Sequence, residues 1–235
     1  MIKWAPLGLL VLLEVGYPLV SGPARAVLVA ATVLVGFFWV LASAGAKLAV
    51  VIVVLGGFAV EALGVATGRP FGVYSYSDAL GPRLLGVPVV IPFAWAWMAY
   101  PAWLAAGRLA TNRLARVPLA ALGLAAWDLF LDPQMVAEHY WTWQNPHPAL
   151  PGVPGVPIGN YLGWLGVALV LMTIVSLVDK PIADDRPLLA LYLWTYASSI
   201  LAHAAFLGLP GSAAWGALGM GLVAMPLIAR LLVPR

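Results

Sequence analysis

Cysteine is absent from this chain of 235 residues, which excludes disulfides, thiolate nucleophiles and thiolate metal ligands. The chain has only three histidines, His139, His147 and His203, and their spacing fits no metal site. There is no Gly-rich loop with the lysine that would hold a phosphate group. The residue types therefore give no support to a metal centre or a nucleotide site.

Charged residues are also scarce, at 9% of the chain, whereas a soluble domain carries about a quarter. Hydrophobic residues make up 63%, and the mean hydropathy is +0.97. Most of the surface must therefore face an apolar medium, for which lipid is the default. The net charge of +3 is too small and too dispersed for a nucleic-acid partner. We predict an all-α, polytopic transmembrane helical bundle that forms a single integral membrane domain over residues 1–235.

Each bilayer span needs about 20 apolar residues, so the chain has room for about seven or eight helices with modest loops. Proline, glycine and charged residues divide it into apolar segments. The predicted spans are Lys3–Val20, Ala24–Ser43, Lys47–Ala66, Val89–Leu109, Arg116–Ala137, Pro157–Val178, Pro187–Leu207 and Ala213–Leu232. The first two are the weakest as separate spans, because only residues 21–23 divide them.

Lysine and arginine are distributed unevenly between the two sides that eight spans would create. One side holds the two termini and three loops, with Lys3, Lys47, Arg108, Arg113, Arg116, Lys180, Arg186, Arg230 and Arg235. The other side holds only Arg25, Arg69 and Arg83. Because cytoplasmic loops carry an excess of Lys and Arg, this bias predicts a multi-pass protein of the cell membrane with both termini in the cytoplasm.

Besides Glu14, three carboxylates lie within predicted spans, where a charged side chain costs about 2.5–3.5 kcal/mol on insertion scales. Glu61 shares a helix face with Gly57 and Gly64, whose small size lets a neighbouring helix approach, so we expect Glu61 to point into the bundle. Asp128 and Asp132 are four residues apart and stack on one helix face. Two buried acids this close favour sharing one proton, and a protonated carboxylic acid beside an apolar substrate is a general acid.

Two loops are longer than a tight connection, Thr67–Pro88 and Glu138–Val156, and both are rich in proline, glycine and aromatic residues. The predicted topology puts both on the outer side. It also puts the three acids in the outer half of the bilayer, because both of their helices run outward. We expect the loops to form an ordered cap above the acids; an ordinary aromatic belt is the alternative interpretation.

Three further residues carry weaker expectations. Pro133, directly after Asp132, should loosen its helix and free carbonyl groups for water or a ligand. Glu14 and His203 also fall in the outer half, and hydrogen-bonded contacts inside the bundle are their preferred interpretation.

Three blocks in the middle of the chain together resemble the CruF-type carotenoid hydratases. The first, Glu61–Tyr76, reads ExxGxxTGxPFGxYxY and is followed by Leu80-Gly81-Pro82 and Gly86-Val87-Pro88. The second, Asp128–Trp143, contains DxxxDPxM and WxW. The third, Gly155–Trp164, reads GVPxGNYxGW. The Pro-rich insert 145–154 departs from the family pattern.

The resemblance implies a cofactor-independent enzyme that adds water to the terminal double bond of an acyclic carotenoid end group, leaving a tertiary hydroxyl. Its partners would be the carotenoid within the bilayer and water. Asp132 or Asp128 would then donate the proton, and Glu61 would orient water as a base. The residues that the resemblance assigns to substrate binding are Tyr74, Tyr76, Trp141, Trp143, Asn160 and Trp164. The charge of Glu61 and the aromatic rings are candidates to stabilise the cation.

Two other classes of protein stay open at this point. An intramembrane prenyltransferase-like enzyme would hold a diphosphate through magnesium on Asp128 and Asp132, but it needs a second Asp-rich motif facing the first. The only other acidic cluster, Asp179–Asp185, is predicted on the opposite side. A transporter or a passive lipid-binding membrane protein would use the acids as a relay or not at all, although the inverted repeats common among transporters are not visible.

Overall fold

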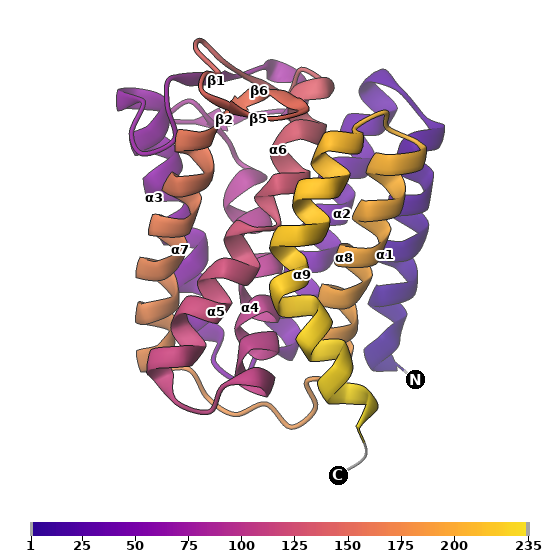
Figure 1. Ribbon diagram of the computed structural model, residues 1–235, viewed down its shortest axis with the longest axis vertical. Helices are drawn as coiled ribbons and strands as arrows, with labels where there is room; N and C mark the ends of the chain where they lie inside the picture. The colour runs from indigo at the N-terminus through magenta and orange to yellow at the C-terminus, as the bar shows by residue number, and fades with distance from the viewer. Residues whose placement is uncertain (1, 234–235) are drawn as a thin grey trace.

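The computed structural model describes residues 2–233 as a helical bundle with short strands gathered at one end (Figure 1). The helices are α1 (Ala5–Gly16), α2 (Gly22–Ser43), α3 (Lys47–Thr67), α4 (Ile91–Leu109), α5 (Arg113–Ala125), α6 (Asp128–Ala137), α7 (Ile158–Val178), α8 (Arg186–Ala205) and α9 (Pro210–Leu232). The strands are β1 (Tyr74–Tyr76), β2 (Arg83–Leu84), β3 (Val87–Pro88), β4 (Trp141–Trp143), β5 (Ala149–Leu150) and β6 (Val153–Pro157). We term the end that carries these strands the capped end.

Within residues 2–233, six helical segments are long and apolar enough to cross a membrane. They are α2, α3, the segment of α5 and α6 together, α7, α8 and α9. The predicted multi-pass, all-α bundle is thereby confirmed. The first predicted span is shorter than expected, because α1 and the 3-10 turn that follows it cover only Ala5–Leu19.

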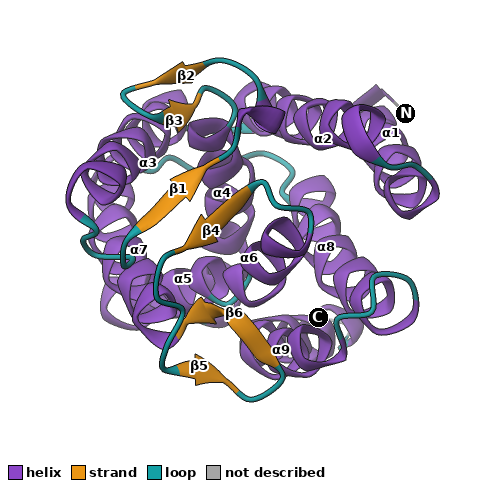
Figure 2. Ribbon diagram, turned by 90° about the horizontal axis from the view of Figure 1, so that it is seen from above, coloured by secondary structure: helices purple, strands orange, loops and turns teal. Residues whose placement is uncertain are grey.

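Helix α4 lies in the middle of the bundle (Figure 2) and packs against α2, α3, α5, α8 and α9. Nearly all of its 19 residues are buried. A helix surrounded by protein has no lipid-facing stripe. Its tryptophan, alanine and proline residues therefore contact other helices, and two of its tryptophans, Trp95 and Trp97, line the cavities described below.

The predicted span over 116–137 is confirmed as one membrane-long segment, but it is not a single unbroken helix, because α5 ends at Ala125 and α6 begins at Asp128. The amide of Trp127 donates to the carbonyl of Leu124 at 3.2 Å, and that of Phe130 to Trp127 at 2.9 Å. Both bonds reach back three residues instead of four, so the chain tightens between the two helices. Asp128 consequently stands in the first turn of a new helix.

Pro133 in α6 has no amide hydrogen to donate to the carbonyl of Leu129. We expected such a carbonyl to be free for water or a ligand, but it accepts a hydrogen bond from Ser212 Oγ at 2.7 Å. Ser212 Oγ also lies 2.8 Å from His203 Nδ1, and His203 Nε2 lies 3.1 Å from Gln134 Oε1. His203 is therefore a hydrogen-bonded bundle contact, as predicted, and the network ties α6 to α8 and α9.

The two long loops meet at the capped end, where β1 pairs antiparallel with β4. Figure 2 shows these strands lying across the ends of the helices. Helix α3 leads directly into this cap: it ends at Thr67 because Gly68 adopts a left-handed conformation, φ +73°, that reverses the chain. The predicted placement of both loops on one side is confirmed. The insert 145–154 contributes to a hairpin in which β5 pairs with β6.

Helix α1 begins and helix α9 ends at the end opposite the cap (Figure 1). The turn between α4 and α5 and the loop between α7 and α8 lie there too, with Arg108, Arg116 and Arg186. This distribution agrees with the two groups of basic residues that the sequence separates. Arg235, which belongs to the larger group, lies outside the described residues.

Candidate functional site

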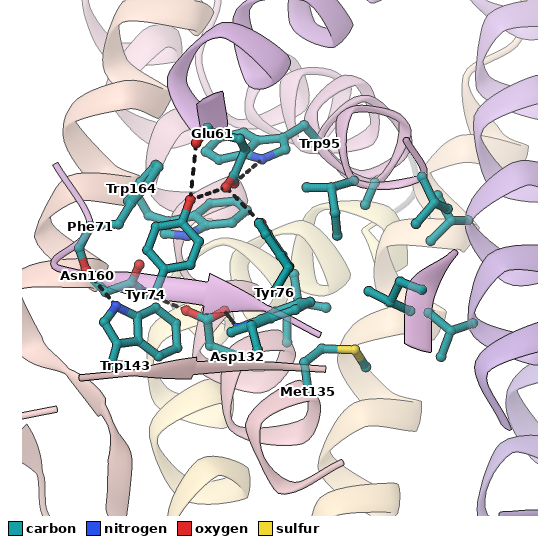
Figure 3. Close-up of a pocket in the computed structure, with 18 residues that line it drawn as sticks. Glu61, Phe71, Tyr74, Tyr76, Trp95, Asp132, Met135, Trp143, Asn160 and Trp164 are labelled. Atoms are coloured by element: carbon teal, nitrogen blue, oxygen red, sulfur yellow. Dashed lines mark hydrogen bonds between the residues drawn. The ribbon is translucent and has the colours of Figure 1, made fainter. Parts of the chain in front are cut away.

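Glu61 is buried on α3 and accepts hydrogen bonds from three aromatic side chains (Figure 3). The phenols of Tyr74 and Tyr76 both donate to Oε2, the latter at 2.8 Å, and the indole of Trp95 donates to Oε1 at 2.9 Å. Burial and the neighbouring Glu61 raise the pKa of Tyr74 and of Tyr76, so both phenols stay protonated and donate. Three donors and no acceptor suit an ionised carboxylate.

The β1–β4 ladder explains why four aromatic rings reach the bundle. Tyr74 stands opposite Trp143, and Tyr76 stands opposite Trp141. Side chains alternate along a strand, so these four are buried while Ser75 and Thr142 face away. The ring centroids of the two cross-strand pairs are 5.6 Å and 5.5 Å apart. The ladder thereby forms an aromatic lid above the helices.

The two aspartates of α6 meet at one amide nitrogen. Asn160 Nδ2, in the first turn of α7, donates to Asp128 Oδ2 at 2.8 Å and also to Asp132 Oδ2. The indole of Trp141 donates to Asp132 Oδ1 at 3.0 Å. Asp128 Oδ1 is buried and has no hydrogen-bond partner within residues 2–233. The predicted stacking of the two acids on one face is confirmed, and Asn160 holds them together.

A small cavity of about 40 Å³ is lined by both Glu61 and Asp132. Its lining includes eight of the nine residues that the sequence singled out: Glu61, Asp132, Tyr74, Tyr76, Trp141, Trp143, Asn160 and Trp164. Asp128 lies behind Asp132 and does not line the cavity. Trp164 stacks on Trp95 with ring centroids 3.8 Å apart and planes 4° from parallel. The three blocks of sequence therefore converge on one aromatic, acid-bearing site.

Trp95 is the main contributor that the sequence did not predict. It lies on α4, between the first and second blocks, and α4 also carries Trp97 and Trp103. A buried indole N–H usually has an acceptor, but that tendency does not say which of the three tryptophans meets Glu61, and Trp97 and Trp103 have no acceptor among the described residues. Phe71 and Met135 also line the cavity. Both residues belong to the sequence blocks that resemble the family, so the sequence could have identified them as candidates for the site.

The other acids lie outside this cavity. Glu14 Oε2 accepts from Trp194 Nε1 at 2.8 Å and from Ser198 Oγ at 3.1 Å, which is the hydrogen-bonded contact that was predicted. Asp179 and Asp185, in the loop before α8 at the end opposite the cap, form ion pairs with Arg116 and Arg108. The second acidic cluster therefore does not face Asp128 and Asp132.

Comparison with known proteins connects this geometry to a family. Residues 22–228 match the family described as "Carotenoid biosynthesis protein". Over 125 residues the chain is 36% identical to a protein of Haloarcula japonica named bisanhydrobacterioruberin hydratase. That alignment spans 51% of this chain and 41% of the relative. No solved structure shows significant similarity. Because the family match covers most of the chain, including α2 through most of α9 and the whole acid-bearing cavity, this protein is a member of the carotenoid biosynthesis protein family.

Proposed function

We propose that this protein hydrates the terminal double bond of an acyclic carotenoid end group and leaves a tertiary hydroxyl. The observation that carries the proposal is the meeting of an aspartate pair and a separate, triply hydrogen-bonded glutamate across one small aromatic cavity. Family membership supports carotenoid chemistry, and the name of the Haloarcula relative supports hydration. No cofactor is needed, because the reaction only adds the elements of water.

Asp132 is the proton donor in this proposal, because it lines the cavity whereas Asp128 does not. An ionised oxygen with no donor is strongly disfavoured in an apolar core, and Asp128 Oδ1 has none among the described residues. The pair therefore holds one proton, which rests on Asp128 and passes to Asp132 as Asp132 protonates the substrate. Asp132 gives a proton to the CH carbon of the alkene, whose π electrons form the new C–H bond. The positive charge then lies on the carbon that bears two methyl groups.

Glu61 and the aromatic lid stabilise that cation and position water. The rings of Tyr74, Tyr76 and Trp141 line the cavity, and aromatic rings attract a cation. Glu61 Oε1 accepts only the Trp95 bond among the described residues, and each carboxylate oxygen has about two acceptor sites. A water molecule held there attacks the cation through oxygen and gives its proton to Glu61. A water-mediated transfer from Glu61 to Asp132 restores the starting state.

The membrane placement belongs to the same proposal. The basic residues at the end opposite the cap favour a cytoplasmic position for that end and for both termini. The capped end and the acid cavity then fall in the outer half of the cell membrane. In that position the polyene stays within the bilayer while water reaches its end group from the membrane surface.

The direct test is expression in a host that makes an acyclic carotenoid, followed by mass analysis of the pigments. We expect products heavier by one water per reacted end, both in cells and with purified protein in lipid. Activity should persist in excess EDTA. A prenyltransferase-like enzyme needs magnesium, so loss of activity in EDTA with recovery on adding magnesium would favour that class. Unchanged pigment with a well-folded protein would reject the hydratase proposal.

Gly64 provides a test of how the glutamate is positioned. A Cβ added at Gly64 would lie 2.8 Å from Tyr74 Oη and 3.1 Å from Phe71 Cδ2, so Gly64→Ala must displace Tyr74 from Glu61. Because a displacement of about 1 Å can cost about 10²-fold in rate, we expect hydration to fall by about that factor. Gly8→Ala is the control, since no atom lies within 4 Å of its added Cβ. Equal rates for both variants would contradict the proposed positioning.

A further inference from the structure

The acid cavity is too small for a carotenoid. Its volume of about 40 Å³ holds about three water molecules, since one needs about 10–15 Å³. Sites for small organic ligands occupy about 300–1,000 Å³. The space between Glu61 and Asp132 holds no more than the tip of the reacting end group, so the rest of a long polyene must lie elsewhere.

A second cavity, of about 450 Å³, adjoins the first. It lies between α1, α2, α4, α6 and α8, and most of its lining is apolar. The two cavities share five wall residues: Val29, Val33, Ala94, Leu131 and Met135. Among its polar side chains, Glu14 and Gln134 already have protein partners, whereas Tyr17 Oη and Trp97 Nε1 have none among the described residues. A hydrocarbon therefore fits this space better than a polar ligand does.

The larger cavity reaches the outer surface of the bundle, where exposed apolar side chains line it. Val15 and Leu19, from α1 and the turn after it, line the cavity and are 53% and 76% exposed. Leu201 and Phe206, from α8 and its C-terminal cap, line it as well and are 60% and 62% exposed. Among the described side-chain hydrogen bonds, only those of Glu14 connect α1 with α8. Apolar side chains thus line the opening between α1 and α8, and few hydrogen bonds join these two helices.

We propose that this second cavity is the binding channel for the polyene chain of the substrate, which enters sideways from the bilayer between α1 and α8. The end group passes the shared wall at Val33, Ala94 and Met135 and reaches Asp132. The proposal rests on the proposed function for the identity of the reacting end. The channel itself is inferred from its volume, its mostly apolar lining and the five residues that it shares with the wall of the acid cavity.

The test fills the channel without touching the acid site. Ala202 on α8 lines the channel, whereas Ala204, two residues further on, is exposed and does not. Ala202→Phe should lower hydration of the full-length carotenoid by about tenfold or more, because even one methylene in an apolar pocket is worth about that much. Hydration of a ten-carbon acyclic alkene with the same end group should be unchanged. Ala204→Phe should leave both reactions unchanged.

A second filled variant and a second measurement distinguish failure of the channel from misfolding and from failure of the proposed function. Thr32→Phe fills the same channel from α2, so a folding defect in one variant does not decide the result, and turnover of the short alkene reports an intact site. The second readout is carotenoid retained per protein after purification, which should fall in both filled variants. Equal turnover and equal retention in all variants would overturn the channel while leaving the hydratase proposal standing. If no variant makes hydrated product, the proposed function fails, and retention alone decides the channel.

Discussion

Replacing Asp132 with asparagine is expected to lower carotenoid hydration by about 10²–10⁴-fold, the usual contribution of a general acid. Asparagine keeps the size of the side chain and an oxygen that can accept from Trp141, but it has no acidic proton. An unactivated alkene is a weak base, so the reaction depends on that proton. The double variant with Asp128→Asn also removes the group that shares the proton, and we expect no product above background.

The measurement is product formed per folded protein in lipid, read by mass, with thermal unfolding as a check on folding. Asp78→Asn is a matched control in the cap, because the Asp78 side chain is 89% exposed and pairs with Arg83. Carotenoid retention should persist in the aspartate variants, since the polyene channel is untouched. Normal hydroxylated product from the double variant would remove these residues from the chemistry.

Glu61→Gln is expected to lower hydration by about 10²–10³-fold, the range measured when a group that stabilises transition-state charge is removed. The amide has nearly the same shape, and its oxygen still accepts from a phenol, but it carries no charge to stabilise a tertiary cation. It also cannot take a proton from the attacking water. The loss should therefore appear in turnover more than in carotenoid retention.

Tyr76→Phe tests whether Glu61 acts through its charge or through its hydrogen bonds, because it removes one hydrogen bond and leaves the charge in place. It removes one donor to Glu61 Oε2, and Tyr74 and Trp95 still hold the carboxylate. One hydrogen bond to a charged group is worth about 1.5–3 kcal/mol, so we expect a smaller loss of turnover than in Glu61→Gln. If the two variants lose equal activity with equal thermal stability, the charge of Glu61 is not the feature that matters.

Local sequence patterns were sufficient to predict how much of this site is arranged. The four-residue spacing of Asp128 and Asp132 puts both on one helix face wherever that helix packs, and Asn160 contacts both. The number of apolar segments and the partition of basic residues placed the two loops on one side, and the β1–β4 pairing confirms it. Helix periodicity and the cost of charge in lipid are properties of short segments, so they can be read without a structure.

Other features depend on contacts between distant segments. The residues at the break between α5 and α6 are Ala126 and Trp127, so no glycine in the sequence indicates that the helix ends there. The carbonyl of Leu129, to which Pro133 cannot donate, accepts a hydrogen bond from Ser212, which lies 83 residues later in the chain. Trp95 was selected as a donor to Glu61 by the packing of α4 against α3. Each of these depends on which side chain from another helix arrives at a given point.

By itself, the sequence determined that this is a multi-pass helical membrane protein, that three carboxylates are candidates for its chemistry, and that its motif blocks resemble one family. Only the tertiary structure decided that Glu61 and Asp132 line one small cavity beneath an aromatic lid, that Asn160 holds Asp128 beside Asp132, and that a larger apolar cavity adjoins the first. The physical reason is that burial and periodicity are encoded residue by residue. The volume and connection of a cavity, in contrast, depend on the side chains of many helices at once.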